Sequence, residues 1–201
     1  MLALATGCGK QQASKAPNPT SAPAPKPSEP AAPSSKPVKT ALPTAGGLSW
    51  NPPALFIAQT PKSSMRAAEY RIDGQGQGDA TLAVFHFGAG QGGDVQSNID
   101  RWVGQFQQPA GTKKNAKPTT RRQVVAGMQV TTVDVKGSYS EMAMNPHATS
   151  PAQPQTHQRL LGAIVEGPQG PVFFKLVGPQ KTVNLADTAF AALINSIHPA
   201  P

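Results

Sequence analysis

Apolar residues recur from Leu48 onward in patterns that predict strands and helices. Partial alternation, with apolar side chains at every second residue, predicts strands over residues 64–72, 120–126 and 128–137. Nearly continuous apolar runs predict buried strands over residues 80–87, 158–166 and 171–177. Glycine-containing breaks separate these strands in pairs, so we expect each pair to form an antiparallel hairpin.

Two segments show the 3.6-residue apolar period of a helix that packs on one side. The first covers residues 94–106, where Asp94 follows two glycines and is a suitable N-cap. The second covers residues 183–197, where Asn184 together with Asp187 is expected to cap the start. The expected buried stripes are Val95, Ile99, Trp102, Val103 and Phe106 in the first helix and Phe190, Leu193, Ile194 and Ile197 in the second.

The elements follow the order β-β-α-β-β-β-β-α, in which strands pair mostly with their sequence neighbours. This order predicts an α+β fold: an antiparallel sheet of about six strands, with two helices packed together on one face. Residues 48–201 are expected to form this single domain. A doubly wound parallel sheet is not expected, because no helix separates most of the successive strands.

The element order resembles that of the PsbP-like family. The last two strands and the closing helix carry the resemblance, through residues 173–179 (Phe-Phe-Lys-Leu-Val-Gly-Pro), Phe190 and Ser196, together with the early residues 50–52 (Trp-Asn-Pro). Family members are antiparallel sheets flanked by helices, and most are extracytoplasmic or interaction proteins without chemistry of their own. The resemblance therefore implies a binding or accessory role.

Residues 9–47 differ in composition from the rest of the chain. They consist mainly of Ala, Pro, Ser, Lys and Gln, so they hold too little apolar surface to form a core, and we expect a disordered Pro-rich linker. The net charge of the chain is +8, and five Lys and one Glu before Trp50 supply half of it. A charge placed on a linker is weak support for nucleic-acid binding, and we expect no nucleic-acid partner.

Residues 1–8 (Met-Leu-Ala-Leu-Ala-Thr-Gly-Cys) resemble the end of a bacterial lipoprotein signal, in which small residues precede a cysteine that receives diacylglycerol. Cys8 is the lone cysteine, which excludes an internal disulfide and makes it the expected lipidation site. Only seven residues precede it and none is basic, so we expect further signal residues upstream of Met1. The alternative is a cytosolic protein with a chance Gly-Cys pair.

The loop from Gly88 to Gly93 matches the G-x-G-x-x-G pattern between an expected strand and an expected helix. That context suits a nucleotide phosphate at the helix N-terminus. A dinucleotide site also needs an acidic residue about twenty positions later, yet no acid lies between Asp100 and Asp134. A flexible loop is the competing interpretation, and a nucleotide-binding enzyme remains an alternative function.

A polar stripe on the first helix is the expected partner-binding surface, because arginine beside tryptophan is common at interfaces. The competing interpretation is a solvated helix face on which Arg101 pairs with a nearby acid. A second candidate surface is a basic cluster that could contact an anionic lipid or polymer. It consists of Lys113, Lys114, Lys117, Arg121 and Arg122. The residues of the stripe are Asp94, Asn98, Arg101, Trp102 and Gln105.

Met142, Met144 and His147, with His157 nearby, combine thioether and imidazole groups that suit Cu(I), so copper handling is a second alternative. The histidines have no metal-site spacing, and no G-x-S-x-G nucleophile motif occurs. We therefore expect no catalysis, cofactor or resident metal. The leading hypothesis is a lipid-anchored protein of the cell envelope, on the inner or outer membrane, which binds a protein or an envelope polymer.

Overall fold

The computed structural model of the 201-residue chain describes residues 42–107, 117–140 and 154–201. The chain divides into residues 1–39 and 40–201, and every described residue belongs to the second unit. Cys8, Met142, Met144 and His147 lie outside the described residues.

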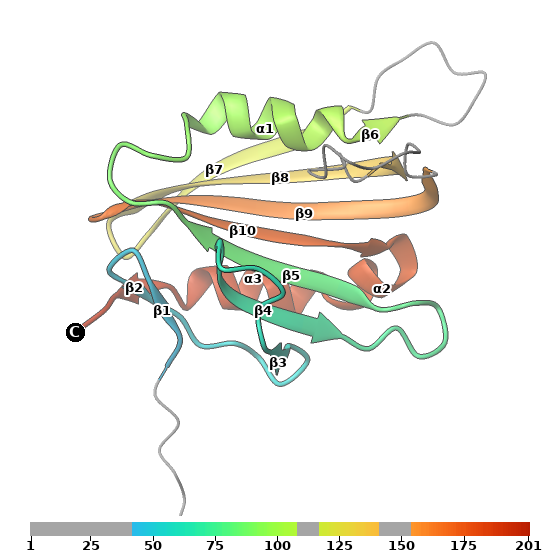
Figure 1. The fold of residues 1–201 in the computed structure, drawn as a ribbon, viewed down its shortest axis with the longest axis horizontal. Coiled ribbons are helices and arrows are strands. Elements are labelled where there is room, and N and C mark those ends of the chain that lie inside the picture. Colours follow the sequence, from blue (N-terminus) through green and yellow to red (C-terminus); the bar gives the residue numbers. More distant parts are fainter. Residues whose placement is uncertain (1–41, 108–116, 141–153) are drawn as a thin grey trace, which may run out of the picture. The chain divides into compact units, whose positions relative to one another are not determined.

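An antiparallel eight-stranded sheet forms the centre of the folded unit (Figure 1). Its order is β3-β4-β5-β10-β9-β8-β6, and β7 also pairs with β8. All six expected strands are present, and the α+β class is confirmed; the short strands β3 and β6 were not expected. The strands are β3 (Ile57–Gln59), β4 (Arg66–Ile72), β5 (Ala80–His86), β6 (Phe106–Gln107), β7 (Thr119–Val125), β8 (Met128–Tyr139), β9 (Gln155–Gly167) and β10 (Gly170–Pro179).

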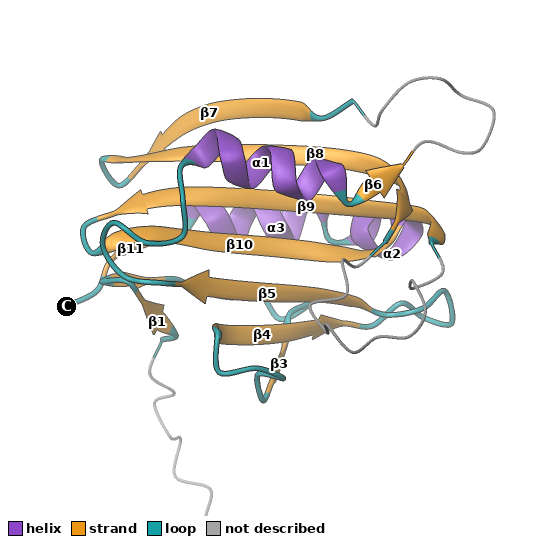
Figure 2. Ribbon diagram, turned by 45° about the horizontal axis from the view of Figure 1, so that its top comes forward, coloured by secondary structure: helices purple, strands orange, loops and turns teal. Residues whose placement is uncertain are grey.

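The helices lie on opposite faces of the sheet, so the expectation that they share one face is wrong. Figure 2 shows α1 (Val95–Gly104) on one side, and α2 (Gln180–Leu185) with α3 (Asp187–Asn195) on the other. The physical reason lies in β9, where residues 158–165 are all buried. Because successive strand residues point to opposite faces, a strand buried at every position needs cover on both sides.

Two apolar clusters fill the space between the sheet and its helices. On the α1 face, Ile99 and Trp102 pack with Leu160, Ile164 and Phe173. On the α3 face, the side chains of Phe190, Leu193 and Ile194 belong to a larger cluster that includes the alternate β9 residues Leu161, Ala163 and Val165.

The closing helix is interrupted rather than continuous. It breaks at Ala186 into α2 and α3, and neither piece has a side-chain N-cap. The expected capping by Asn184 and Asp187 is therefore wrong, because both side chains accept hydrogen bonds of 2.8 Å from Arg159 Nη1 instead.

Arg159 is the polar link between β9, β8 and the closing helices. Its Nε and Nη2 atoms donate to the Asp134 carboxylate at 2.9 and 2.8 Å, while Nη1 reaches Asn184 and Asp187. The side chain is only 7% exposed, so the charge needs these acceptors. Hydrogen bonding to Asp134 raises the pKa of Arg159 further above its ordinary value, although burial acts in the opposite direction.

A small second sheet joins the start and the end of the folded unit. It has the order β1-β2-β11, with β1 (Thr44–Ala45), β2 (Leu48–Ser49) and β11 (His198–Pro199). Gly46 and Gly47, with φ of 59° and 72°, form the β1–β2 turn. β1 lies inside the range 9–47 expected as linker, so the ordered part begins earlier than the apolar pattern indicated.

Gly162 on β9 allows α1 to pack closely on the sheet. A Cβ atom at this position would overlap the Trp102 ring and lie 2.8 Å from Val133 Cγ1. We expect Gly162→Val to lower the free energy of unfolding by about 2 kcal/mol or more, because the closely packed helix would have to move. Urea denaturation followed by circular dichroism measures this loss.

The matched control is Gly104→Ala at the end of α1, where an added Cβ meets nothing within 4 Å. This change should leave stability unchanged or raise it by up to about 0.5 kcal/mol. An unfolding midpoint for Gly162→Val equal to that of the unaltered protein would contradict the packing described here.

Candidate functional site

The polar stripe expected on α1 is partly inside the protein. Asn98 and Trp102 are buried, at 2% and 3% exposure, so neither side chain offers surface to a partner. Asp94 and Arg101 are exposed. Gln105 is half-buried and accepts a hydrogen bond of 2.7 Å from Lys175 Nζ on β10.

Asn98 explains why this stripe is polar. Its amide nitrogen donates to the backbone oxygens of Gly92 and Asp94 at 2.7 and 2.9 Å, which ties the glycine-rich loop to the first turn of α1. Its Oδ1 accepts a hydrogen bond from Arg101 Nη2. The polar pattern thus follows from closing a loop, and Arg101 pairs with the Asn98 amide and not with the acid that the competing interpretation named.

Asp94 caps α1 as expected. Its Oδ1 accepts from the Ser97 amide at 2.9 Å, and its Oδ2 accepts from the Ser97 hydroxyl at 2.6 Å. These hydrogen bonds hold the pKa of Asp94 below its usual value. A carboxylate therefore already occupies the acceptor position at this helix N-terminus, where a bound phosphate would need the same amides.

The backbone conformation and the packing of the loop explain why residues 88–93 contain so many glycines. Gly88, Gly90, Gly92 and Gly93 have φ between 70° and 96°, where side chains are disfavoured. A Cβ on Gly92 would also come within 2.9 Å of both the Phe87 and the Phe173 rings. The G-x-G-x-x-G match therefore reflects a tight loop packed against aromatic rings.

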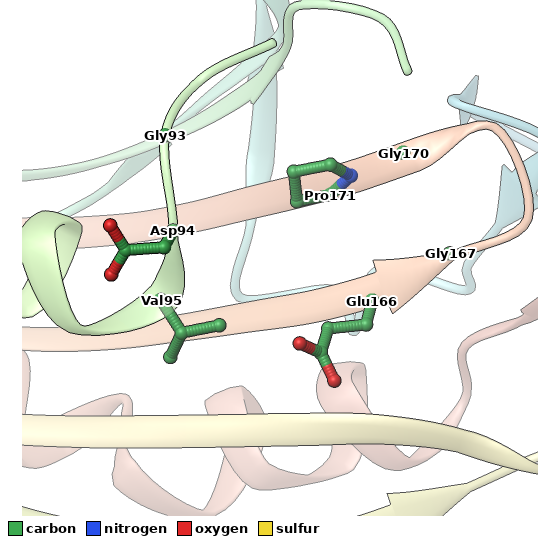
Figure 3. A pocket seen from close by; sticks show the side chains of 7 residues that line it. All are labelled: Gly93, Asp94, Val95, Glu166, Gly167, Gly170 and Pro171. Atoms are coloured by element: carbon green, nitrogen blue, oxygen red, sulfur yellow. The ribbon is translucent and has the colours of Figure 1, made fainter. Parts of the chain in front are cut away.

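A shallow hollow of about 270 Å³ lies where this loop meets the β9–β10 turn (Figure 3). Asp94 and Glu166 are its charged side chains, so the hollow is acidic. It is lined by Gly93, Asp94, Val95, Glu166, Gly167, Gly170 and Pro171.

A chain of aromatic rings leads from the core to the surface beside the same loop. Trp102 packs edge-on against Phe173, with ring centroids 6.4 Å apart, and Phe173 contacts Phe87 at 5.8 Å. Phe87 in turn stacks with Phe85 at 6.2 Å. Phe87 is 39% exposed, although its neighbour Phe173 is buried.

Arg66 at the start of β4 completes this surface. Arg66 pairs with Phe85 across β4 and β5, and its guanidinium carbon lies 6.0 Å from the Phe85 ring centroid. We call Arg66, Phe85 and Phe87 the aromatic patch. It lies on the α1 face, over β4 and β5, where no helix of the described residues covers the sheet.

Sequence reasoning missed the aromatic patch. A signal was present, because Phe85 and Phe87 alternate with His86 and therefore point to the same side of the chain as it leaves β5. His86 lies between them and its Nε2 is 3.0 Å from the Gln169 backbone oxygen, so it contacts the β9–β10 turn.

Glu69 positions Arg66 within the aromatic patch. Its Oε2 accepts hydrogen bonds from Arg66 Nη1 at 2.7 Å and from the Lys62 amide at 2.9 Å. Burial alone would raise the pKa of Glu69, but these hydrogen bonds and the nearby positive charges outweigh it, so the pKa is lowered. The Glu69 side chain is only 2% exposed, which makes it a structural anchor.

The other candidate metal ligands, the remaining histidines, form no metal-binding cluster among the described residues. His157 is exposed on β9 with φ of 54°, and His198 lies in β11. Within residues 42–107, 117–140 and 154–201, no group of three or more His, Cys, Asp or Glu side chains is placed to hold a metal ion. The Met142, Met144 and His147 loop lies outside these ranges.

No family model matches the chain, and no curated protein matches its sequence. Among solved structures, it is similar to the solution structure of cyanobacterial PsbP from Synechocystis sp. PCC 6803, with a TM-score of 0.46 and 8% identity. The match covers 77% of this chain and 87% of that chain. This is the fold family that the element order resembles, and the likeness concerns the fold alone.

The Glu69 anchor makes stability depend on pH in a defined direction. Because the folded-state pKa lies below the unfolded value, the contribution is full above about pH 4.5 and is lost as the pH falls through the folded pKa. We expect Glu69→Gln to lower the free energy of unfolding by about 1 kcal/mol at pH 7, and the difference from the unaltered protein to shrink toward pH 3. Urea titrations at several pH values measure this difference.

Asp100→Asn serves as control, since Asp100 is an exposed carboxylate on α1 that bonds only to the Gln96 side chain among the described residues. It should change stability by less than about 0.5 kcal/mol at either pH. A Glu69→Gln difference that persists undiminished at pH 3 would mean that the carboxylate charge is not the stabilising feature.

Proposed function

We propose that this protein is a lipid-anchored, extracytoplasmic binding or accessory protein without catalytic activity, and that the aromatic patch contacts a partner protein. The exposed Phe87 ring, backed by Phe173 and Trp102, is the observation that carries the proposal. Aromatic and arginine side chains are enriched in the contact regions of protein interfaces.

The side chains of the aromatic patch are held in place by their neighbours, so the proposed contact surface is largely formed before a partner binds. Phe85 and Phe87 are held by neighbouring rings, so little side-chain freedom is lost when a partner covers them. Arg66 is fixed by its hydrogen bond to Glu69, so its guanidinium is also held in place before a partner binds. An apolar protein surface suits this arrangement better than a strongly charged polymer does.

The nucleotide alternative finds less support at the α1 N-terminus. A phosphate there would meet the Asp94 carboxylate, with Glu166 also lining the hollow, and like charges disfavour its binding. The copper alternative depends on Met142, Met144 and His147, which lie outside the described residues.

Attachment to a membrane follows from the proposed lipid on Cys8, through the resemblance of residues 1–8 to a lipoprotein signal. Residues 9–39 separate that cysteine from the folded unit, which begins at Thr40. No helix among the described residues is long and apolar enough to cross a membrane.

Lipidation is tested by metabolic labelling in the native host with an alkyne-tagged fatty acid, using the gene with its natural upstream sequence. We expect label on the unaltered protein and none on Cys8→Ser, because Cys8 is the lone thiol available for diacylglycerol transfer. Cys8→Ser should also move from the membrane fraction to the supernatant. Label that survives in Cys8→Ser, or an unaltered protein without label, would refute the anchor.

The aromatic patch is tested by replacing Phe87 with the photo-crosslinking residue benzoylphenylalanine in cells. We expect a discrete crosslinked protein, and purified domain added to membranes should compete for it about tenfold less well when it carries Phe87→Asp, as for a central interface residue. Mass spectrometry identifies the product as protein or polymer, so a polymer adduct would replace the proposed partner class.

Leu185 offers the matched control, because it is 57% exposed but lies on α2, on the opposite face of the sheet. Benzoylphenylalanine at position 185 should give no such product, and Leu185→Asp should compete normally. Equal crosslinking from positions 87 and 185, or no product from position 87, would count against the aromatic patch.

A further inference from the structure

Strand β7 forms an edge of the main sheet. Among the described residues it pairs with β8 alone, and its residues 119–124 are all exposed. The opposite edge is β3, a strand of only three residues. The longer edge therefore offers more unpaired backbone to another extended chain.

The register shows which backbone groups of β7 point outward. Ala126 and Gly127, with φ of 48° and 81°, form a two-residue turn of the type I′ kind, and Val125 pairs directly with Met128. In such a hairpin the pair next to the turn, here Val125 and Met128, is hydrogen-bonded, and every second pair after it is hydrogen-bonded too. Gln123 and Arg121 therefore also direct their N–H and C=O groups toward β8. The N–H and C=O groups of Thr120, Arg122 and Val124 consequently face away from β8.

The charge along this edge is positive. Among the described residues, no ion pair involves Lys117, Arg121 or Arg122. The nearest acid across the hairpin is Asp134, opposite Thr119, and its carboxylate is bound by Arg159.

We infer that β7 binds an extended acidic segment of a partner protein as an added strand. The outward groups of Thr120, Arg122 and Val124 supply the backbone hydrogen bonds, and Arg121 and Arg122 select carboxylates on the two faces. A second copy of this chain fits poorly, because antiparallel pairing centred on β7 would bring arginines together. The inference uses a surface separate from the aromatic patch and does not depend on the lipid.

Hydrogen exchange of the full chain, produced without lipid and labelled with nitrogen-15, tests this directly. The probes are the eight-residue peptide Thr-Thr-Glu-Glu-Thr-Glu-Glu-Thr, which carries carboxylates on both faces of a strand, and the matched peptide with Lys in place of each Glu. The acidic peptide should slow exchange at the amides of Thr120, Arg122 and Val124, which have no strand partner among the described residues. The lysine peptide should bind at least about tenfold more weakly, because its charge repels the arginines.

Val124→Pro removes an outward amide without removing a bond to β8, so the fold should survive while acidic-peptide binding is lost. Val124→Thr keeps the amide and should bind normally. If Val124→Pro proves unfolded, the double variant Arg121→Glu, Arg122→Glu decides the matter, since it should reverse the preference and favour the lysine peptide.

Three outcomes would overturn the inference: no protection at millimolar acidic peptide, equal binding of the two peptides, or a charge-reversed variant that keeps its preference for the acidic peptide. Phosphatidylglycerol vesicles form a third arm. Binding to these vesicles with no response to the acidic peptide would mean that β7 faces an anionic membrane and not a protein segment. Failure here would leave the crosslinking result at Phe87 unaffected.

Discussion

The burial of β9 on both faces is the constraint on which the rest of the structure depends. Eight consecutive residues of this strand, 158–165, are buried, so apolar layers must form on both sides of the sheet. Helix α1 supplies one layer, and α3 supplies the other. Because α1 is short and centred away from β4 and β5, the same arrangement leaves Phe85 and Phe87 partly uncovered.

Arg159 is the polar counterpart of that apolar constraint. A guanidinium inside a continuously buried strand is costly unless each donor finds an acceptor, and here Asp134, Asn184 and Asp187 supply them. Two of these acceptors, Asn184 and Asp187, lie on either side of Ala186, where the closing helix breaks. One buried charge therefore couples the β8–β9 pairing to the position of both short helices.

Local patterns made the six longer strands, the three hairpins and the Asp94 cap predictable, because each depends on neighbouring residues. The placement of helices on both faces of the sheet was harder to predict, although adjacent apolar residues such as Leu160 and Leu161 indicate that β9 is buried on both faces. β3 and β6 are too short to show a period. At the candidate site, Asn98 and Trp102 were assigned to a partner-binding surface but lie inside, because the polar role of Asn98 depends on a loop closure that no periodicity reveals.

The surfaces left for binding lie where the layered packing ends. In the strand order, β5 and β7 are separated by β10, β9 and β8, and strands are spaced about 4.8 Å apart, which places them roughly 19 Å from each other. The aromatic patch consists of packed rings beside an arginine that is paired with Glu69, whereas the β7 edge is cationic and offers backbone groups. The two proposed surfaces share no residue, so binding at one does not use the groups that bind at the other.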